Sequence, residues 1–293
     1  MNNGARTDIP ELFGRGRPVF SFEFFLPKDP GALDGFFAEV RTLRELGPGY
    51  VTLTYGAGGS ARDRTIDTVG RLQRETGLPA ACHLTGIAHT KAEVSAILDR
   101  LAAMDIRHLV ALRGDAPQDA PVKPVGQRDF GYAADLVRFV KARGGFRMAV
   151  AGYPEKHPEA ATPEADLAAF AAKVREGADW AMTQLFFDAK DYFAFVARAR
   201  AAGADLPIVP GIMPVTGYAQ LKRFTALCGT RIPAEMEAAL SHIQADPDAV
   251  VRYGIEWAVK QCRELLAGGA PGVHFYTLNK SRSTAEVLKR LRA

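Results

Sequence analysis

Eight short apolar segments recur along the chain, and each of the first seven is followed by a longer segment that contains the hydrophobic period of a helix. The apolar segments begin at residues 19, 50, 79, 108, 147, 180, 207 and 272, so the first seven starts are 27 to 39 residues apart. Several of them, such as "HLVALRG" from His108, are apolar on both faces, which is typical of parallel strands buried on both sides. This alternation predicts a succession of βα units.

The segments between the strands have the pattern of amphipathic helices. In "AEVSAILDRLAAM", apolar side chains recur at i, i+3, i+4 and i+7, namely Val94, Ile97, Leu98 and Leu101. Thr162 and Pro163 supply a helix N-cap followed by proline at the first helical position. The last interval, from 207 to 272, is longer than the others and holds an extra helical stretch at roughly 247–266.

Eight such units in 293 residues predict an α/β fold, a (β/α)8 TIM barrel with an extra helical segment before the last strand. A doubly wound open sheet is the alternative, but no strand-like segment is followed by the GxGxxG pattern of a dinucleotide-binding turn. No linker or low-complexity segment interrupts the chain, so we expect residues 1–293 to form one domain.

The charged residues are nearly balanced, with 37 lysines and arginines against 33 acidic residues, and the two signs are interspersed. Because nucleic-acid-binding proteins usually cluster their positive charge, the pI near 9.0 favours that class only weakly. A small basic excess serves an anionic small molecule equally well.

Nothing in the sequence indicates a membrane or secreted protein. No segment approaches the ~20 apolar residues of a membrane span, and the N-terminal segment lacks the apolar core of a secretory signal. Three cysteines, Cys82, Cys228 and Cys262, are scattered and lack the spacing of a metal site. We therefore expect a cytoplasmic protein.

Polar residues gather where the strand-like segments end. Glu23 lies late in "SFEFFLPK", and later segments end in "LTYGAGGSARDRT", "CHLT", "LRGD", "GYPEKHPEA", "TQLFFD" and "YTLNKS". Because a barrel carries its chemistry at the C-terminal ends of its strands, this pattern predicts an enzyme. The glycines of "YGAGGS" could form only a turn, but backbone N–H groups before a helix also suit a phosphate or a flavin.

Each polar residue also has a purely structural interpretation. His83 could be a buried histidine with satisfied partners, His157 a helix cap, and Asp115 the ion-pair partner of Arg113. The six histidines show no HxH or HExxH spacing, and Ser60 does not lie in a nucleophile elbow. Acid–base or cofactor chemistry therefore fits the sequence better than metal or covalent catalysis.

In order and spacing, eight segments closely resemble the methylenetetrahydrofolate reductase family: "SFEFFLPK", "TYGAGGSARDRT", "CHLT", "RHLVALRGD", "YPEKHPEA", "TQLFFD", "PGIMPV" and "HFYTLN". The likeness runs from about Val19 to Asn279, and in length the chain is similar to bacterial members, which lack the C-terminal regulatory domain of eukaryotic ones. The resemblance implies a flavin-dependent barrel that reduces 5,10-methylenetetrahydrofolate to 5-methyltetrahydrofolate for methionine synthesis. NADH or NADPH would reduce FAD first, and the folate would reoxidise it.

The resemblance implies roles for three residues. Glu23 matches the catalytic acid that protonates a folate ring nitrogen so that the ring opens to an iminium, and we expect burial among phenylalanines to raise its pKa. Asp115 matches a carboxylate between flavin and pterin, where negative charge favours the cationic iminium. Gln184 matches the amide that contacts pterin or nicotinamide.

The resemblance places the flavin site on residues at the strand ends and the helices beyond them: Thr54, Tyr55, Ala57, His83, Arg113, Gly114, Asp115, Tyr132, Ala133, Tyr153, His157, Glu159, Ala160, Asp166 and Lys173. Tyr192 and Tyr218 match positions near the substrate, with tyrosine at 218 in place of the phenylalanine of bacterial members. Lys280 replaces the usual arginine, so the contact to the folate tail keeps its charge but loses the bidentate fork. "GAGGSARDRT" likewise replaces the commoner "GANSGERDRT".

Several alternatives stay open at this point. The sequence does not choose between NADH and NADPH, because no dinucleotide fingerprint applies outside a dinucleotide fold. The alternative function is a folate-binding or methyl-transferring barrel without redox chemistry, against which the flavin-type residues around His157 and Lys173 argue. We expect a homo-oligomer with small-molecule partners, and neither a metal, a membrane nor a nucleic acid.

Overall fold

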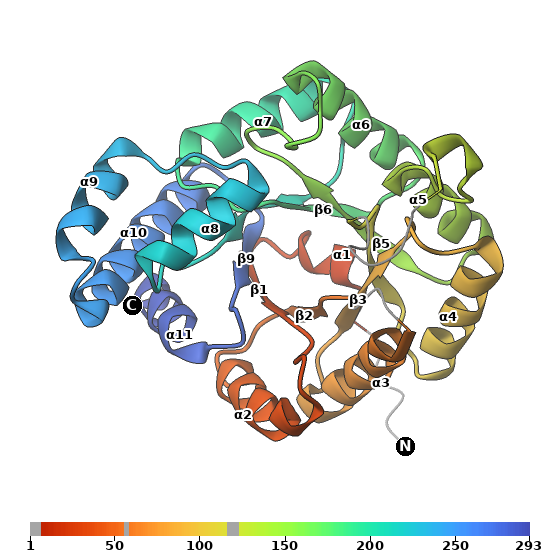
Figure 1. The fold of residues 1–293 in the computed structure, drawn as a ribbon, viewed down its shortest axis with the longest axis horizontal. Helices are drawn as coiled ribbons and strands as arrows, with labels where there is room; N and C mark the ends of the chain where they lie inside the picture. Colours follow the sequence, from red (N-terminus) through yellow and green to blue (C-terminus); the bar gives the residue numbers. More distant parts are fainter. Residues whose placement is uncertain (1–6, 56–58, 116–122) are drawn as a thin grey trace.

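Parallel strands form a nearly closed ring that is surrounded by helices (Figure 1). The computed structural model describes residues 7–55, 59–115 and 123–293, without the side chains of residues 59–61. Over these ranges the strand order is β7-β6-β5-β4-β3-β2-β1-β9-β8. The strands are β1 Val19–Phe24, β2 Tyr50–Leu53, β3 Ala80–Thr85, β4 His108–Leu112, β5 Arg147–Gly152, β6 Trp180–Thr183, β7 Ile208–Val209, β8 Gly211–Ile212 and β9 Gly272–Tyr276.

The ring closes where β7 and β8 meet, on either side of Pro210. β7 pairs with β6, whereas β8 pairs with β9. The two halves of one extended segment therefore pair with different strands. Pro210 has no N–H group to donate to a ladder, but its carbonyl oxygen accepts from the His274 N–H at 2.9 Å. The predicted (β/α)8 barrel is confirmed, and its seventh strand is divided into two short halves.

Helices alternate with the strands and form the outer wall (Figure 1). They are α1 Ile9–Leu12, α2 Leu33–Arg44, α3 Gly59–Thr76, α4 Lys91–Ala103, α5 Ala133–Arg143, α6 Pro163–Arg175, α7 Ala189–Ala201, α8 Tyr218–Cys228, α9 Ala234–Ile243, α10 Pro247–Ala267 and α11 Ser281–Arg292, with 3-10 turns η1 Pro30–Ala32 and η2 Val125–Gln127. The predicted N-cap is confirmed, because the Thr162 hydroxyl oxygen accepts from the Ala165 N–H at 3.2 Å. The predicted extra stretch is α10, but α8 and α9 precede it between β8 and β9.

Each strand separates an outer layer of side chains from an inner one. On β1, Phe22 and Phe24 pack outward in the cluster beneath the helices, and the Phe24 ring lies 5.6 Å from that of Phe36 on α2. Ser21 and Glu23 alternate with them and face the interior, where His83 and His274 are their neighbours. The period of two along a strand therefore divides the apolar and polar residues of "SFEFF" between two environments.

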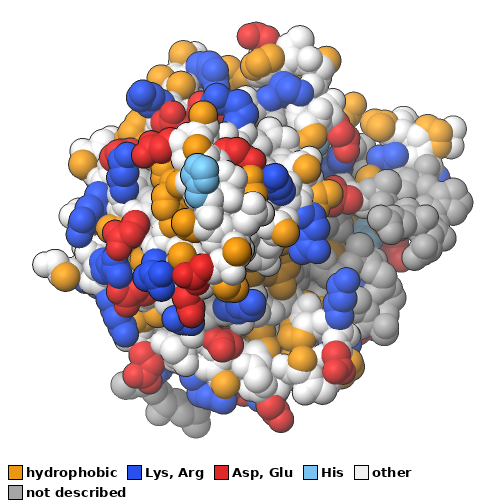
Figure 2. Space-filling model, turned by 60° about the vertical axis from the view of Figure 1, so that its left-hand side comes forward, with side chains coloured by type: hydrophobic (Ala, Val, Ile, Leu, Met, Phe, Trp, Pro, Cys, Tyr) orange, Lys and Arg blue, Asp and Glu red, His pale blue; other side chains and the backbone are white. Residues whose placement is uncertain are grey.

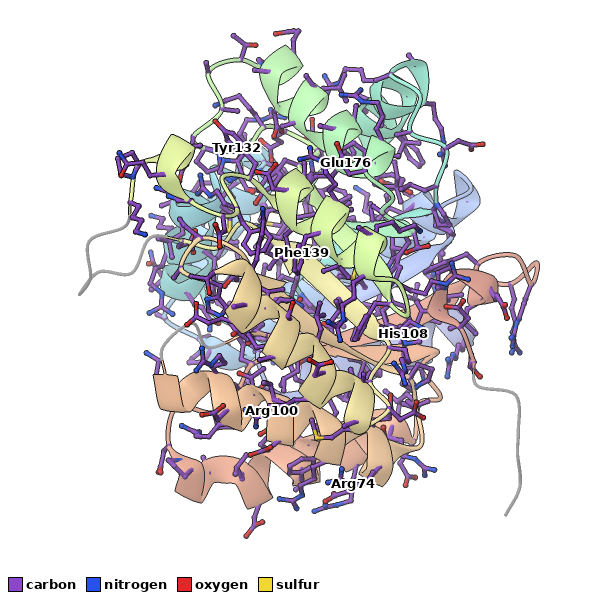
Figure 3. All side chains as sticks on the ribbon, turned by 90° about the vertical axis from the view of Figure 1, so that its right-hand side faces the viewer. Arg74, Arg100, His108, Tyr132, Phe139 and Glu176 are labelled. Carbon is purple, nitrogen blue, oxygen red and sulfur yellow. The ribbon has the colours of Figure 1, made fainter. Side chains whose placement is uncertain are left out.

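The N-terminal end of the barrel is covered by α1. Ile9 and Leu12 pack against the inner-layer cluster that contains Tyr50 and Trp180. Asp8, just before this helix, accepts from Arg147 at 2.7 Å and lies 3.2 Å from the His108 imidazole. Figure 3 shows His108 at this end and Tyr132, which precedes α5, toward the other. The candidate site therefore lies at the end marked by Tyr132.

The surface adds two observations. Among the described residues, no helix combines the length and the apolar composition that a membrane span requires. On the face drawn in Figure 2, lysine and arginine side chains are intermixed with aspartate and glutamate. This face does not present the single-sign patch typical of a nucleic-acid-binding surface.

The closure of the ring is expected to depend on Gly211. A Cβ atom at this position would lie 2.3 Å from the Thr183 carbonyl oxygen and 2.7 Å from the Tyr276 hydroxyl. We expect Gly211→Ala to lower the free energy of unfolding by about 3 kcal/mol, because neither neighbour can move freely. Gly35→Ala is the matched control: Gly35 lies on α2 with nothing within 4 Å, so it should gain about 0.5–1 kcal/mol. Urea denaturation checks both values, and equal effects would contradict the expectation.

Candidate active site

Glu23 lies inside the barrel between two histidines from other strands. Its side chain is 6% exposed, and its Oε2 atom lies 3.3 Å from the Nε2 atom of His83 on β3 and 3.4 Å from that of His274 on β9. The register sets this arrangement, since Glu23 is opposite Tyr276 and His274 is opposite Ser21. On its other side, His274 Nδ1 lies 2.8 Å from the Ser21 hydroxyl. Ser21, His274 and Glu23 thus form a continuous polar chain.

The ionisation of Glu23 differs from the expectation. Burial raises the pKa of Glu23, but the charge of His83 and the hydrogen bond from His274 outweigh this effect and lower the pKa to about 2. The prediction that burial among phenylalanines raises the pKa of Glu23 is therefore wrong. Phe22 and Phe24 belong to the outer layer, so the groups that surround the carboxyl are imidazoles.

The turn after β9 is attached to β1 beside Glu23. The Thr277 hydroxyl donates to the Glu23 carbonyl oxygen at 2.6 Å. The Asn279 side-chain amide accepts from the Phe25 N–H and donates to the Phe25 carbonyl oxygen, both at 2.8 Å. Leu278 and Asn279 have positive φ angles of 51° and 57°, a strained conformation that these hydrogen bonds hold in place.

The ends of β4 and β5 bring together a second group of predicted residues. The Arg113 guanidinium makes a bidentate ion pair with Glu159, at 2.5 and 2.8 Å. The Tyr153 and His157 rings lie 4.6 Å apart, edge to face. Asp166 accepts from the His157 N–H at 3.1 Å, so the first turn of α6 is tied to this loop.

Lys173 is a half-buried cation on α6. Its ammonium donates to the Ala151 carbonyl oxygen at 2.6 Å, and burial lowers the pKa of Lys173 to about 8, although the charge of Asp166 opposes that change. Ala160, on the same loop, donates its N–H to the His157 carbonyl oxygen at 3.0 Å.

Asp115 is exposed at the end of β4, close enough for its charge to act on Arg113 and Tyr153. Gly114, with φ of 85°, packs so closely on Thr85 that a Cβ atom would lie 2.7 Å from the threonine Cβ. The chain before Asp115 can follow this path only with glycine at 114.

The ends of β2 and β3 carry the remaining flavin candidates. Thr54 accepts from the Leu26 N–H at 3.3 Å, and the Tyr55 hydroxyl lies 2.7 Å from the Nε2 atom of His89. His83 Nε2 is buried and makes no hydrogen bond within the described part of the chain. Ala57 lies outside the described residues.

The aromatic ring of Tyr132 and the side-chain amide of Gln184 differ in exposure, since Tyr132 is exposed and Gln184 is half-buried. Tyr132 is 61% exposed at the N-cap of α5, which begins at Ala133. The Gln184 side-chain oxygen accepts from the Leu185 N–H at 2.8 Å. For residues 7–55, 59–115 and 123–293, no hydrogen bond is found for its side-chain nitrogen, which leaves a donor at the end of β6.

Three predicted substrate residues are not brought to Glu23 by these contacts. Tyr192 is buried on α7, where its hydroxyl donates to the Ile208 carbonyl oxygen at 2.7 Å. The Tyr218 hydroxyl donates to Glu237 on α9, and the Lys222 ammonium lies 4.4 Å from the centre of its ring. Lys280 is exposed at the N-cap of α11 and lines a small cavity beside Thr277.

Sequence reasoning missed Ser21, His274, His89 and Asn279. The sequence did contain a signal for Ser21 and His274, because each is a polar residue in an otherwise apolar strand segment. Ser21 lies two residues before Glu23 and His274 two residues before Tyr276, so each pair shares one face of its strand. Asn279 and His89 lie in loops, where a polar residue alone indicates nothing.

The ionised state of Glu23 can be observed directly. Isotope-edited infrared spectra of the ligand-free protein, minus those of Glu23→Gln, should show a carboxylate band at pH 7 that converts to a protonated carboxyl only near pH 2. Because the folded pKa is lowered from 4.5, the stability that Glu23 contributes should be complete above pH 4.5 and lost as the pH falls toward 2. A protonated carboxyl band at pH 7 would contradict the assignment.

The barrel is similar in sequence to known proteins over almost its whole length. The family model described as methylenetetrahydrofolate reductase matches residues 8–292. A 5,10-methylenetetrahydrofolate reductase of Pectobacterium carotovorum is 39% identical, covering 91% of this chain and 88% of that protein. The Escherichia coli protein of the same name is 37% identical, covering 94% and 92%.

Other relatives are longer or more distant. A "probable methylenetetrahydrofolate reductase (NADH)" of Oryza sativa is 40% identical over 97% of this chain, which spans 50% of that protein. The chain thus spans about half the length of the plant relatives it matches. A Clostridium thermocellum protein, described as binding two copies of 5-methyl-5,6,7,8-tetrahydrofolic acid, shares the fold with a TM-score of 0.68 at 11% identity, covering 96% and 98% of the two chains.

The family model spans almost the whole barrel, and two bacterial relatives exceed 35% identity over nearly their full length. On these grounds the chain belongs to the methylenetetrahydrofolate reductase family.

Proposed function

We propose that this chain reduces 5,10-methylenetetrahydrofolate to 5-methyltetrahydrofolate, with FAD as its cofactor and NADH or NADPH as its reductant. The observation that supports this most strongly is the buried Glu23 carboxylate with two imidazoles inside the barrel end. The reaction adds one hydride and one proton to the folate, and this group of three side chains is proposed to deliver the proton. Names of plant relatives favour NADH.

The residues present fit a flavin. The Thr85 hydroxyl, at the end of β3, is buried without a hydrogen-bond partner among the described residues, as expected of a group that binds a ligand. Lys173 supplies a half-buried cation, and Arg113 and the Tyr132 ring lie at the same end of the barrel. Bound FAD would supply hydride transfer between the nicotinamide and the folate. The complete set proposed to hold it is the one inferred from the family resemblance, including Thr54, Tyr55 and Ala57.

The proton is proposed to pass through Glu23. The ionised carboxylate of Glu23 has two imidazoles at 3.3 and 3.4 Å from its Oε2 atom. When an adjacent histidine is in its imidazolium form, it passes one proton to the Glu23 carboxylate, and Glu23 gives that proton to a folate ring nitrogen; the carboxylate is then ionised again and the histidine is neutral. The histidines thereby replace the phenylalanine environment as the source of acidity at neutral pH.

Asp115 and Gln184 are proposed to orient the substrate. The exposed carboxylate of Asp115 would favour the cationic iminium that forms when the folate ring opens. The unused amide nitrogen of Gln184 would donate to the pterin or the nicotinamide. The three cysteines are unpaired in the described residues, which supports a reducing cytoplasm. We propose a homo-oligomer on the family resemblance alone.

The two half-reactions test the role of Glu23. Purified protein should be yellow, bleach with NADH under anaerobic conditions, and regain colour with methylenetetrahydrofolate. In Glu23→Gln, NADH should still bleach the flavin at close to the normal rate, whereas reoxidation by the folate should slow by about 10²–10⁴-fold. Glu235→Gln, an exposed carboxylate on α9, is the matched control. Equal loss of both half-reactions would exclude the acid role, and a colourless protein that binds folate would support the non-redox alternative.

Lys173 gives flavin binding a pH dependence. Because burial lowers the pKa of Lys173 to about 8, its positive charge is present below pH 8 and lost above it. Flavin affinity of the reconstituted protein should therefore fall between pH 7 and pH 9. Lys173→Met should bind more weakly at pH 7 and lose this dependence, while Lys190→Met, an exposed lysine on α7, should behave like the unmodified protein. A pH profile unchanged in Lys173→Met would contradict the assignment.

A further inference from the structure

One loop, residues 153–160, carries several of the proposed flavin contacts, and we call it the flavin loop. It lies between β5 and α6, includes Tyr153 and His157, and contains neither helix nor strand. Its backbone carbonyl groups therefore need partners other than a regular ladder. Cations outside the predicted flavin set supply several of them. One is Arg198 on α7, which donates to the Pro154 carbonyl oxygen at 3.2 Å.

Lys156 holds the flavin loop from inside. Its ammonium donates to three carbonyl oxygens of the same loop, those of His157 at 3.1 Å, Pro158 at 3.4 Å and Ala160 at 2.6 Å. An ammonium has three donors and no acceptor, so this arrangement uses its full capacity. The side chain is half-buried, and the loop is folded around a cation that the loop itself provides.

Arg231 holds the flavin loop from outside. It lies in the linker between α8 and α9, and its backbone N–H and its Nε atom donate to Glu155 Oε2 at 3.1 and 2.9 Å. Its Nη2 atom donates to both carboxylate oxygens of Asp191 in the first turn of α7, each at 3.0 Å. Gly229, which follows α8 with a φ of 68°, packs on the same loop, since a Cβ atom there would lie 3.1 Å from Pro158 Cγ. The linker therefore joins the flavin loop to α7 and α8.

The contact of Arg231 differs from an ordinary surface ion pair. The arginine side chain is 72% exposed, but that of Glu155 is only 14% exposed. Burial raises the pKa of Glu155, and the hydrogen bonds from Arg231 oppose this change. If Arg231 were removed, a largely buried carboxylate would lose the cation that faces it, which is a costly arrangement. The carboxyl would then take a proton or turn toward water, and either change alters the loop.

We propose that Lys156 and Arg231 are positioning residues for the flavin, which hold the flavin loop in its binding conformation before the cofactor arrives. The proposal rests on the function proposed above. Neither side chain has to touch the flavin, because each acts through the backbone that carries Tyr153 and His157. A loop that is already ordered loses less conformational freedom on binding, so the cofactor binds more tightly.

A cycle of single and double substitutions tests Arg231. Ligand-free protein is titrated with FAD, and the change in flavin fluorescence gives the affinity. Arg231→Gln should weaken binding about tenfold, because Glu155 loses its cation. The double variant Arg231→Gln/Glu155→Gln should recover most of this loss, because no carboxylate is then left unpaired. At saturating FAD, both variants should be bleached by NADH at the rate of the unmodified protein.

Arg290→Gln is the matched control for this cycle. Arg290 bridges Glu256 on α10 and Glu286 on α11, much as Arg231 bridges two carboxylates, but it does not contact the flavin loop. Its substitution should leave FAD affinity unchanged. An Arg231→Gln protein that binds FAD as tightly as the Arg290→Gln protein would overturn the role of Arg231, and so would a double variant as weak as Arg231→Gln.

Small amines test Lys156. Lys156→Ala should lose about tenfold in FAD affinity. Ethylammonium should restore part of this loss, because its N–H groups can donate to the same carbonyl oxygens. Tetramethylammonium at the same ionic strength has the charge but no N–H group, and it should restore nothing. Unchanged affinity in Lys156→Ala, or equal rescue by the two ions, would overturn the role of Lys156. Failure of the unmodified protein to bind FAD would instead overturn the proposed function.

Discussion

The contact between the Glu23 carboxylate and two imidazoles is the interaction on which the candidate active site depends. An ionised carboxylate inside a barrel costs several kcal/mol unless partners compensate for lost water. Its partners come from β3 and β9, one of which is adjacent to β1 and the other two strands away. The three groups can meet only if the ring has the observed register, so the barrel and the contact around Glu23 are consequences of the same strand pairing.

Much of the architecture follows from the sequence because its signals are local. The spacing of the strand segments, the helical stripe at 94–101 and the cap at Thr162 each depend on neighbouring residues, and each is confirmed. The division of the seventh strand could not be inferred in this way. Pro210 is visible in the sequence, but the choice of different neighbours by the two halves is a property of the closed ring.

The environment of Glu23 shows where local reasoning fails. "SFEFF" suggests a carboxyl among phenylalanines, but alternate residues of a strand face opposite sides, so sequence neighbours are not spatial neighbours. Glu23 and His274 are 251 residues apart. Tyr192 was matched to a position near the substrate by resemblance. In this structure its hydroxyl donates to the Ile208 carbonyl oxygen inside the core. The positions of Arg113, Glu159, His157 and Asp166, by contrast, are brought together as a group.

The division at Pro210 also makes the strand pairing uneven around the ring. β7 and β8 each pair over two residues, whereas β1 pairs with β9 over five. The seam is therefore the part of the ring where the fewest backbone hydrogen bonds resist separation. The helices α8, α9 and α10 follow β8 in the chain and precede β9. The pairing that sets Glu23 beside His274 is thus longer than the pairing on either side of Pro210.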